Sequence, residues 1–199
     1  MLEICSKCGN HEWDKEVDGN TIKCPKCGYE WKFEKLPIYF LTGCSGVGKT
    51  TTAIELQKLT DQYVILDVDW LRNVVWPQND EEENNLIEQI FYLTKDISQS
   101  KKAVVWTMAG GLDRLSRAYG KRFFSKIKVL ALTAEPETIR KRMTEGRGID
   151  DAGWIQSSVD YNNYFRTHDI LDDTKYDTLD CTNGTPAEIA RKVLEWLRK

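Results

Sequence analysis

The residues of this chain best suited to chemistry lie between Gly43 and Thr50. Their letters, GCSGVGKT, fit the pattern G-x-x-x-x-G-K-[ST], which is a phosphate-binding loop. Glycines allow such a loop to turn its backbone N–H groups toward phosphate oxygens. Lys49 would then contact the β- and γ-phosphates, and the Thr50 hydroxyl would bind Mg²⁺. The residues predicted to contact the nucleotide in this loop are Gly43, Ser45, Gly46, Val47, Gly48, Lys49, Thr50 and Thr51.

The flanking residues predict the strand and the helix that must position this loop. Residues 36–41, LPIYFL, are a short apolar run typical of a buried strand. After the loop, Ala53, Leu56 and Leu59 recur at helical spacing, which predicts that a helix begins there. The N-terminus of that helix would add partial positive charge beside the phosphates. We therefore expect a nucleoside-triphosphate site. Whether the phosphoryl group is transferred or only hydrolysed stays open.

Two carboxylates follow the next apolar run. Residues 63–67, YVILD, predict a second buried strand that ends in Asp67, and Asp69 lies two residues further on. In a parallel α/β sheet the carboxyl ends of the strands meet at one edge, where ligands bind. We therefore expect both acids to lie near the phosphates and the Mg²⁺ ion. An acidic surface turn is the alternative interpretation.

Four of the six cysteines form two C-x-x-C pairs near the N-terminus. Cys5 and Cys8 are separated by fifteen residues from Cys24 and Cys27, a spacing typical of a zinc ribbon. Four thiolates complete a tetrahedral site and leave no open position for catalysis, so we expect structural Zn²⁺. Residues 1–35 are the predicted ribbon. Because so short a segment buries little core, metal binding would supply its folding energy.

The overall charge and apolar content limit the partners. The net charge is −3, and the ribbon has six Lys against seven Asp or Glu, so it has no basic footprint for nucleic acid. A structural cap or a protein contact is therefore the favoured role for the ribbon, and nucleic-acid contact the weaker one. No apolar run approaches the roughly 20 residues of a membrane span, so we expect no membrane contact. The phosphate-binding loop favours a reducing, cytoplasmic location.

Further candidates follow the third and fourth predicted strands. Residues 103–106 predict a strand whose exit contains Gly110 and Gly111 in place of the acid of a motor ATPase. Those glycines would permit close approach of a substrate, although a simple turn into the next helix is equally open. After a strand over residues 127–132, Arg142 and Arg147 lie in a cluster of arginines. Such a cluster could neutralise phosphoryl charge or be a solvated helix face.

The loop GCSGVGKTT, followed by LDVDWLR over residues 66–72, resembles the P-loop small-molecule kinases. It is similar to the adenylylsulfate kinases, whose signature is L-D-G-D-x-x-R, with Val68 here in place of glycine. It is also similar to phage-type polynucleotide kinases, which carry D-x-x-R at this distance from the loop lysine. Shikimate, gluconate and chloramphenicol kinases share the general layout. The resemblance covers about residues 36–199 and leaves the ribbon outside.

This resemblance implies roles for five side chains. Asp69 would accept the proton of the substrate hydroxyl, and Asp67 would be an outer-shell partner of Mg²⁺. Arg72 would contact an anionic group of the substrate. The arginine cluster would belong to a lid, in which Arg142 stacks on adenine and Arg147 closes over the transferred phosphoryl group. With Lys49, the catalytic set would be Lys49, Asp69 and Arg147, and the substrate set Asp69, Arg72, Gly110 and Gly111.

The order of predicted elements gives a fold and three hypotheses. Strands and helices alternate over residues 36–199, which predicts a three-layer α/β domain with a parallel sheet of about five strands. The first hypothesis is an ATP- and Mg²⁺-dependent kinase that acts on a hydroxyl of a small molecule or a nucleotide. The others are a polynucleotide 5′-hydroxyl kinase and a nucleotide-dependent regulatory switch whose ribbon docks a protein. The sequence does not name the acceptor.

Overall fold

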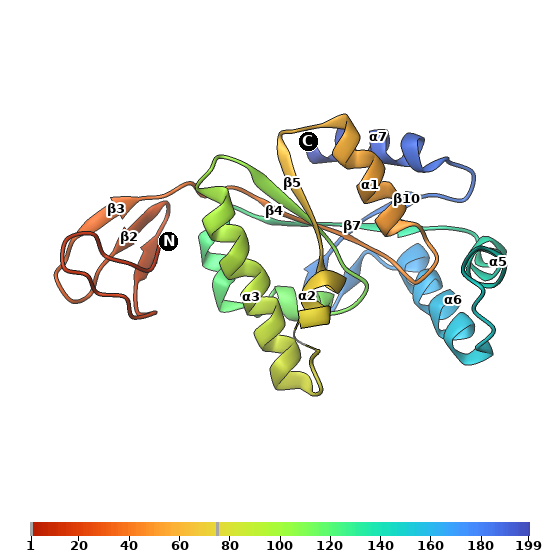
Figure 1. The fold of residues 1–199 in the computed structure, drawn as a ribbon, viewed down its shortest axis with the longest axis horizontal. Coiled ribbons are helices and arrows are strands. Elements are labelled where there is room, and N and C mark those ends of the chain that lie inside the picture. Colours follow the sequence, from red (N-terminus) through yellow and green to blue (C-terminus); the bar gives the residue numbers. More distant parts are fainter. Residues whose placement is uncertain (1, 75) are drawn as a thin grey trace.

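The computed structural model describes residues 2–74 and 76–199, and its centre is a parallel sheet. Five strands lie in the order β10-β7-β4-β6-β5, and each pairs with its neighbour in parallel (Figure 1). This confirms the predicted sheet of a P-loop protein. The strands are β4 (Ile38–Thr42), β5 (Tyr63–Asp67), β6 (Ala103–Thr107), β7 (Ile127–Thr133) and β10 (Asp177–Asp180).

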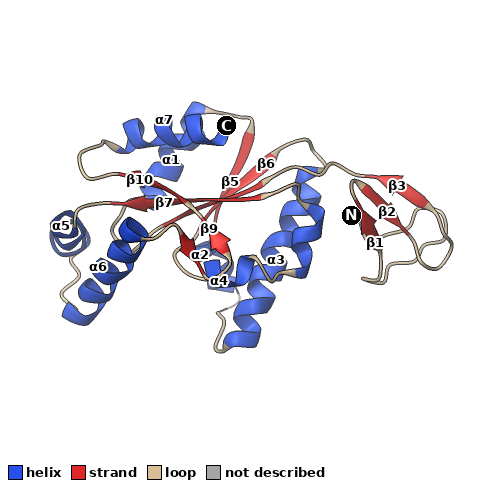
Figure 2. Ribbon diagram, turned by 180° about the vertical axis from the view of Figure 1, so that it is seen from behind, coloured by secondary structure: helices blue, strands red, loops and turns tan. Residues whose placement is uncertain are grey.

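Helices cover both faces of this sheet (Figure 2). Helices α1 and α7 lie together on one face, and α3 lies on the other (Figure 1). None of the helices in the described part of the chain has the length and apolar content to cross a membrane. The helices are α1 (Lys49–Leu59), α2 (Val68–Val74), α3 (Asp80–Ser98), α4 (Leu112–Leu115), the 3-10 helix η1 (Tyr119–Phe123), α5 (Pro136–Arg147), α6 (Ala152–Thr167) and α7 (Pro186–Leu197).

Strand β4 positions the phosphate-binding loop because it is buried on both sides. Ile38 and Phe40 belong to the core beneath α3, whereas Tyr39 and Leu41 belong to the core beneath α1 and α7. A strand that packs on two layers requires a continuous apolar sequence. Because β4 pairs with β6 on one side and β7 on the other, the loop after it emerges at the middle of the sheet edge. Ligands of parallel α/β sheets bind at such a point.

Helix α3 begins earlier than the apolar spacing of the sequence indicates. Residues 77–85 are almost all polar, yet they contain the first turn of α3, which begins at Asp80. The Asn79 side chain accepts a hydrogen bond of 3.0 Å from the Glu82 N–H, which caps the helix. A short hairpin of β8 (Ile170–Leu171) and β9 (Thr174–Lys175) precedes β10 and was not apparent in the sequence.

The N-terminal ribbon packs against α3. Its strands β1 (Glu16–Asp18), β2 (Thr21–Lys23) and β3 (Glu30–Lys32) form an antiparallel sheet. Ile22 and Phe33 of the ribbon are buried in the same core as Phe91 of α3. The ring of Phe33 meets the ring of Phe123 edge-on, with centroids 6.0 Å apart.

Polar contacts also fix the ribbon to α3. The Lys95 ammonium is almost fully buried and lies 2.6 Å from a carboxylate oxygen of Glu3. Gln99 exchanges two hydrogen bonds with the backbone of Glu34, at 2.9 and 3.2 Å. A buried ammonium that lost its carboxylate would strongly destabilise the fold, so this pair fixes one docking position. The division of the chain at residue 35 stays a prediction, because the two parts share one hydrophobic core.

The shared core predicts that a ribbon substitution destabilises the whole chain. Ile22→Ala removes a fully buried side chain and should lower the free energy of unfolding by about 2–5 kcal/mol. Denaturant unfolding followed by tryptophan fluorescence and by far-UV circular dichroism should show one shifted transition. Ile4→Ala, at a half-exposed position of the same ribbon, should change stability by less than about 0.5 kcal/mol. A separate early transition confined to the ribbon would contradict the shared core.

Candidate active site

A cavity of about 740 Å³ opens at the carboxyl edge of the sheet. Its walls come from the loop after β4, the end of β5, helices α5 and α6, and the exit of β10. This volume lies within the usual range for small-molecule sites. The lining residues are Ser45, Gly46, Val47, Gly48, Lys49, Thr50, Thr51, Thr52, Asp67, Asp69, Met108, Ala109, Arg142, Gly146, Arg147, Trp154, Cys181, Gly184, Pro186 and Ile189.

Two glycines of the loop are required by its shape. Gly43 has a φ of +137°, and a Cβ atom there would lie 2.5 Å from the carbonyl oxygen of Leu132. Gly48 has a φ of +109° and caps the N-terminus of α1. A left-handed or crowded backbone of this kind favours glycine. The first turn of α1 holds no acidic residue, so its N–H groups and partial positive charge favour an anion.

Lys49 is held inside the loop. Its Nζ donates hydrogen bonds to the carbonyl oxygens of Gly43, at 2.8 Å, and Cys44, at 3.0 Å. Burial lowers the pKa of this ammonium, and the negative charges of Asp69 and Asp67 oppose that shift. Carbonyl oxygens only partly replace the water that a buried ammonium loses. Phosphate oxygens would stabilise its charge far better, so the geometry fits an anionic ligand.

The loop threonine and the first acid lie together at the end of β5. The Thr50 hydroxyl donates a hydrogen bond of 3.4 Å to a carboxylate oxygen of Asp67. The other Asp67 oxygen accepts a bond of 3.0 Å from the backbone N–H of Asp69. Asp67 and Asp69 both line the cavity. Hydroxyl and carboxylate oxygens are hard donors, which suit Mg²⁺ better than a soft metal.

The two candidate lid arginines reach the cavity from α5. Arg142 donates to the carbonyl oxygen of Val47, at 3.0 Å, and to that of Cys181, at 2.8 Å. It thereby connects the phosphate-binding loop to the exit of β10. Arg147 ends α5, and its guanidinium carbon lies 5.6 Å from the ring centroid of Trp154. Arg147 therefore adds a cation to the cavity that Asp67 and Asp69 also line.

Arg72 has a carboxylate partner on its own chain. Its guanidinium donates to both oxygens of Glu83 in α3, at 2.8 and 2.9 Å. Among the described residues, those that line the cavity do not include Arg72. An anionic substrate group would have to compete with this bidentate pair. A role for Arg72 in substrate binding therefore stays a prediction that this contact does not favour.

The two glycines after β6 take different places. Gly110 lines a smaller hollow beside the cavity. Gly111 has a φ of +85° and caps α4, and a Cβ atom there would lie 3.3 Å from Ile87 and Met108 side chains. Packing alone therefore accounts for Gly111, whereas Gly110 lies at a surface that a substrate could reach.

Sequence reasoning missed the apolar part of the cavity wall. Trp154 from α6 and Ile189 from α7 line it, together with Cys181 and Pro186. Trp154 lies near the N-terminus of a helix and belongs to no recognisable motif. Cys181, Pro186 and Ile189 lie in a loop and a helix whose sequence indicates only ordinary packing. Only the three-dimensional arrangement shows that these side chains face Arg142.

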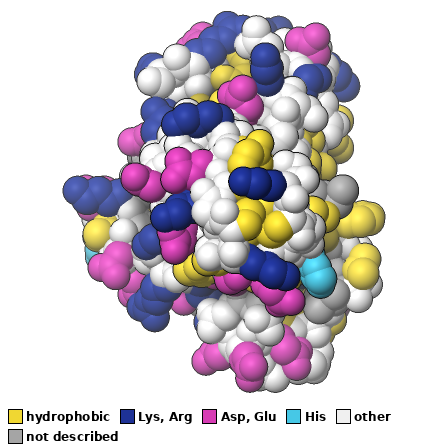
Figure 3. All heavy atoms as spheres, turned by 90° about the vertical axis from the view of Figure 1, so that its left-hand side faces the viewer, with side chains coloured by type: hydrophobic (Ala, Val, Ile, Leu, Met, Phe, Trp, Pro, Cys, Tyr) yellow, Lys and Arg dark blue, Asp and Glu magenta, His cyan; other side chains and the backbone are white. Residues whose placement is uncertain are grey.

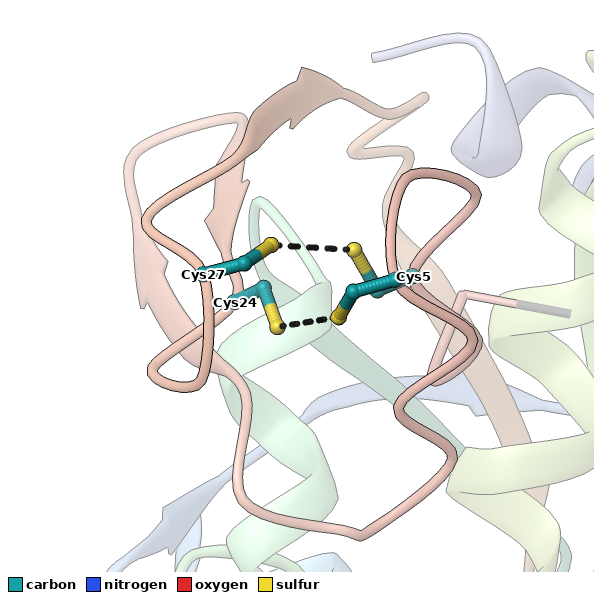
Figure 4. Close-up of side chains that lie close together, drawn as sticks. Cys5, Cys24 and Cys27 are labelled. Atoms are coloured by element: carbon teal, nitrogen blue, oxygen red, sulfur yellow. Dashed lines mark hydrogen bonds between the residues drawn. The ribbon is translucent and has the colours of Figure 1, made fainter.

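The four N-terminal cysteines form a compact cluster (Figure 4). The sulfur atoms of Cys5 and Cys27 are 3.7 Å apart, as are those of Cys8 and Cys24. All four sulfurs lie within 4.8 Å of one another. Zn–S bonds of about 2.3 Å in a tetrahedron place sulfurs about 3.8 Å apart, so the cluster fits Zn²⁺.

Neighbouring groups shift the pKa values of Cys24 and Cys27 in opposite directions. The Asn10 side chain donates to the Cys24 sulfur at 3.7 Å, a partner that sequence reasoning missed. Burial acts to raise the pKa of Cys24, but N–H groups of Cys27 and Lys26 and the Asn10 amide lower it to about 6. The N–H of Tyr29 lowers the pKa of Cys27, but burial and the adjacent thiols raise it to about 11. Since thiolates at this spacing repel one another, full ionisation requires a cation.

Comparison with known sequences shows the family to which this chain belongs. A family profile described as an AAA domain matches residues 40–163, which include the loop, Asp67, Asp69 and both candidate lid arginines. The chain belongs to this AAA domain family. The ribbon lies outside the match. No protein sequence with a curated description matches this AAA domain protein significantly.

Solved structures show which fold this AAA domain has. A sugar kinase from Janibacter sp. HTCC2649 is 20% identical, with a TM-score of 0.61 over 82% of this chain and 95% of that one. A gluconokinase from Sinorhizobium meliloti 1021 is 17% identical, with a TM-score of 0.56 over 84% and 94%. A shikimate kinase from Acinetobacter baumannii, solved with shikimate, is 20% identical, with a TM-score of 0.52 over 83% and 95%. The AAA domain therefore has the P-loop kinase fold.

The sulfur cluster predicts about one zinc ion per chain. Metal analysis of protein purified without added metal or chelator should find it, and Cys24→Ser should lose most of it. Cys181→Ser changes a cysteine outside the cluster and should retain the metal. Zinc-free protein from an anaerobic preparation would contradict the assignment.

The position of Lys49 predicts a loss of nucleotide affinity without a loss of stability. Lys49→Ala should weaken ATP binding by roughly tenfold or more, because a charge-assisted phosphate contact is lost. Its melting temperature without ligand should change little. Lys58→Ala removes an exposed lysine from the same helix and should bind ATP like the parent protein. Equal ATP affinity of the Lys49 and Lys58 variants in calorimetry would contradict the site.

Proposed function

We propose that this AAA domain protein is an ATP- and Mg²⁺-dependent kinase that phosphorylates a hydroxyl of a small molecule or a nucleotide. The observation that supports it best is that one cavity gathers Lys49, Thr50, Asp67, Asp69 and Arg147. Phosphoryl transfer needs phosphate contacts, metal ligands, a proton acceptor and a mobile cation in one place. Each of these needs matches a different member of the set.

The nucleotide would lie along the wall formed by the loop and the β10 exit. Backbone N–H groups of Gly46 and Gly48 and the Lys49 ammonium would bind its phosphates. Its base would lie toward Arg142, Pro186 and Ile189, where a cation and apolar surface meet. A planar guanidinium stacks well on an aromatic ring. The carbonyl contacts of Arg142 hold that guanidinium at the cavity wall.

The magnesium ion would be held by the Thr50 hydroxyl and, through its outer shell, by the Asp67 carboxylate. Their separation of 3.4 Å shows that both oxygens already point to one region beside the loop. When bound, Mg²⁺ neutralises charge on the phosphates. The Asp67 carboxylate also accepts a hydrogen bond from the backbone N–H of Asp69, which connects the two acidic residues.

Asp69 would accept the proton of the acceptor hydroxyl. As the hydroxyl oxygen bonds to the γ-phosphorus, the bond from that phosphorus to the β–γ bridging oxygen breaks and ADP leaves. The proton goes to the Asp69 carboxylate. Arg147 would neutralise charge on the phosphoryl group in transit and, with Trp154, keep water from the cavity.

The four cysteines would hold structural zinc, which keeps the ribbon folded against α3. The four sulfurs would fill all four coordination positions of the zinc ion and leave none for water or substrate, so a catalytic role for this metal is not supported. The thiolates also need a reducing compartment, which supports the predicted cytoplasmic location.

The other two hypotheses have less support. The face of the ribbon end in Figure 3 carries acidic and basic side chains interspersed, without the basic stripe that a polynucleotide needs. The buried ribbon side chains Ile22 and Phe33 contact this chain, so they are not available to dock a partner protein. A switch also needs no proton acceptor in the cavity, whereas Asp69 lies there.

The proposal predicts a selective effect of Asp69→Asn. Transfer to an acceptor found by screening should fall by roughly 10²–10⁴, because the substitution keeps the size and removes the base. ATP affinity should stay within about threefold, since the loop contacts remain. Initial rates of ADP formation with and without the acceptor measure the first effect, and calorimetry measures the second.

Asp67→Asn is the matched comparison. Its rate should recover in part when the Mg²⁺ concentration is raised, whereas that of Asp69→Asn should not. A wild-type transfer rate in Asp69→Asn would remove this residue from the mechanism. Failure of every acceptor among nucleosides, nucleotides, sugars and 5′-hydroxyl oligonucleotides would favour the switch.

A further inference from the structure

A second hollow, of about 300 Å³, opens directly beside the nucleotide cavity. The two share Ser45, Ala109 and Trp154, so a molecule in the hollow would face the phosphate-binding loop. One wall is the exit of β6, and the opposite wall is α6. The lining residues are Cys44, Ser45, Ala109, Gly110, Trp154, Ser157, Ser158 and Tyr161.

The chemistry of this lining is neutral and rich in hydroxyls. Of the described residues that line it, none carries a charged side chain. Ser157, Ser158 and Tyr161 of α6 each carry a hydroxyl, a group that can donate and accept hydrogen bonds, and that of Ser157 donates to the carbonyl oxygen of Trp154 at 3.0 Å. Trp154 adds a flat apolar ring at the border with the nucleotide cavity. Such a lining matches a ligand with several hydroxyls and exposed C–H groups.

Two arginines on the helices that follow β5 and β6 are already engaged by acids. Arg72 forms its bidentate pair with Glu83. Arg114, in α4, donates hydrogen bonds to the side chains of Asp80, at 2.7 Å, and Asn84, at 2.9 Å. A carboxylate or phosphate on the acceptor is usually bound by a guanidinium or an ammonium. An anionic group of the acceptor could bind Arg72 or Arg114 only by displacing Glu83 or Asp80, respectively.

Acidic residues also make binding of an anionic acceptor less favourable. Burial and then the negative charge of Asp113 raise the pKa of Tyr161, so this side chain stays a neutral phenol. The first turn of α3, to which Arg72 and Arg114 are bound, contains Asp80, Glu81, Glu82 and Glu83. Figure 3 shows acidic side chains gathered at the lower end of the molecule, where α3 begins in Figure 1.

We propose that the acceptor is an uncharged polyhydroxylated molecule, a sugar or a polyol, bound in this hollow against α6. The inference rests on the proposed kinase function and narrows its substrate class. The acceptor hydroxyl would attack the γ-phosphorus of ATP, the bond to the ADP oxygen would break, and Asp69 would take the proton. Ser157, Ser158 and Tyr161 would determine specificity by exchanging hydrogen bonds with the other hydroxyls.

Matched acceptors test the substrate class. Aldoses and alditols would be compared with aldonates and sugar phosphates of the same carbon skeleton, with ADP formation as the readout. The neutral members should show kcat/KM at least tenfold above their anionic counterparts. A preference for the aldonate or the sugar phosphate would overturn this inference and leave the kinase proposal intact. Turnover of no member by protein that binds ATP would overturn both.

A charge placed at the rim tests the location. Ser157 is exposed, and its hydroxyl donates to the carbonyl oxygen of Trp154 at 3.0 Å, so Ser157→Arg can keep the fold. Ser157→Arg should raise kcat/KM for the aldonate relative to the aldose by about tenfold, through a charge-assisted contact. Ser157→Gln lengthens the side chain without adding charge, so it should not raise kcat/KM for the aldonate relative to the aldose. Equal preferences in both variants, with wild-type ATP affinity and melting temperature, would show that the acceptor binds elsewhere.

Discussion

The partly buried ammonium of Lys49 is the constraint around which the active site is arranged. Its two hydrogen bonds to loop carbonyls stabilise it only in part, and burial lowers its pKa. An anion at the loop would remove this deficit, and the N-terminus of α1 favours an anion at the same place. The acids proposed to position the metal and to accept the proton, Asp67 and Asp69, line the same cavity and are two residues apart in the sequence. A phosphate group at the loop would therefore have both cationic and acidic side chains near it.

The fold maintains this arrangement through strands and helices that are distant in sequence. Strand β4 is buried on both faces, so the loop after it has little freedom. Arg142 connects α5 to that loop and to the exit of β10, which joins the proposed lid to the base-binding wall. On the opposite side, Glu83 connects α3 to α2, the helix that carries Asp69. The ribbon is fixed to the same α3 by Lys95 and Glu3. Zinc would thus stabilise the helix that supports the acceptor side.

Much of this could be predicted from the sequence, because local patterns determine it. The loop motif requires glycines at particular backbone angles, and the continuous apolar runs require a parallel sheet covered on both faces. The partner of Arg72 could not be predicted, because Glu83 lies eleven residues away on another helix and tertiary packing brings them together. Likewise, Ile22 and Phe33 are recognisable as buried residues, but their sequence does not tell which surface covers them. The hydroxyl face of α6 carries no motif at all, and only its position beside Ala109 and Gly110 gives it meaning.

The central claim is that the cavity transfers the γ-phosphoryl group to a bound hydroxyl and not to water. ATP whose γ-phosphate oxygens are labelled with ¹⁸O tests this directly, with neutral sugars and polyols present and the products analysed by mass spectrometry. The account predicts that the labelled phosphoryl group appears on the acceptor, with little labelled inorganic phosphate and little ATP consumption when the acceptor is omitted. Labelled inorganic phosphate formed at the same rate with or without any acceptor would contradict it.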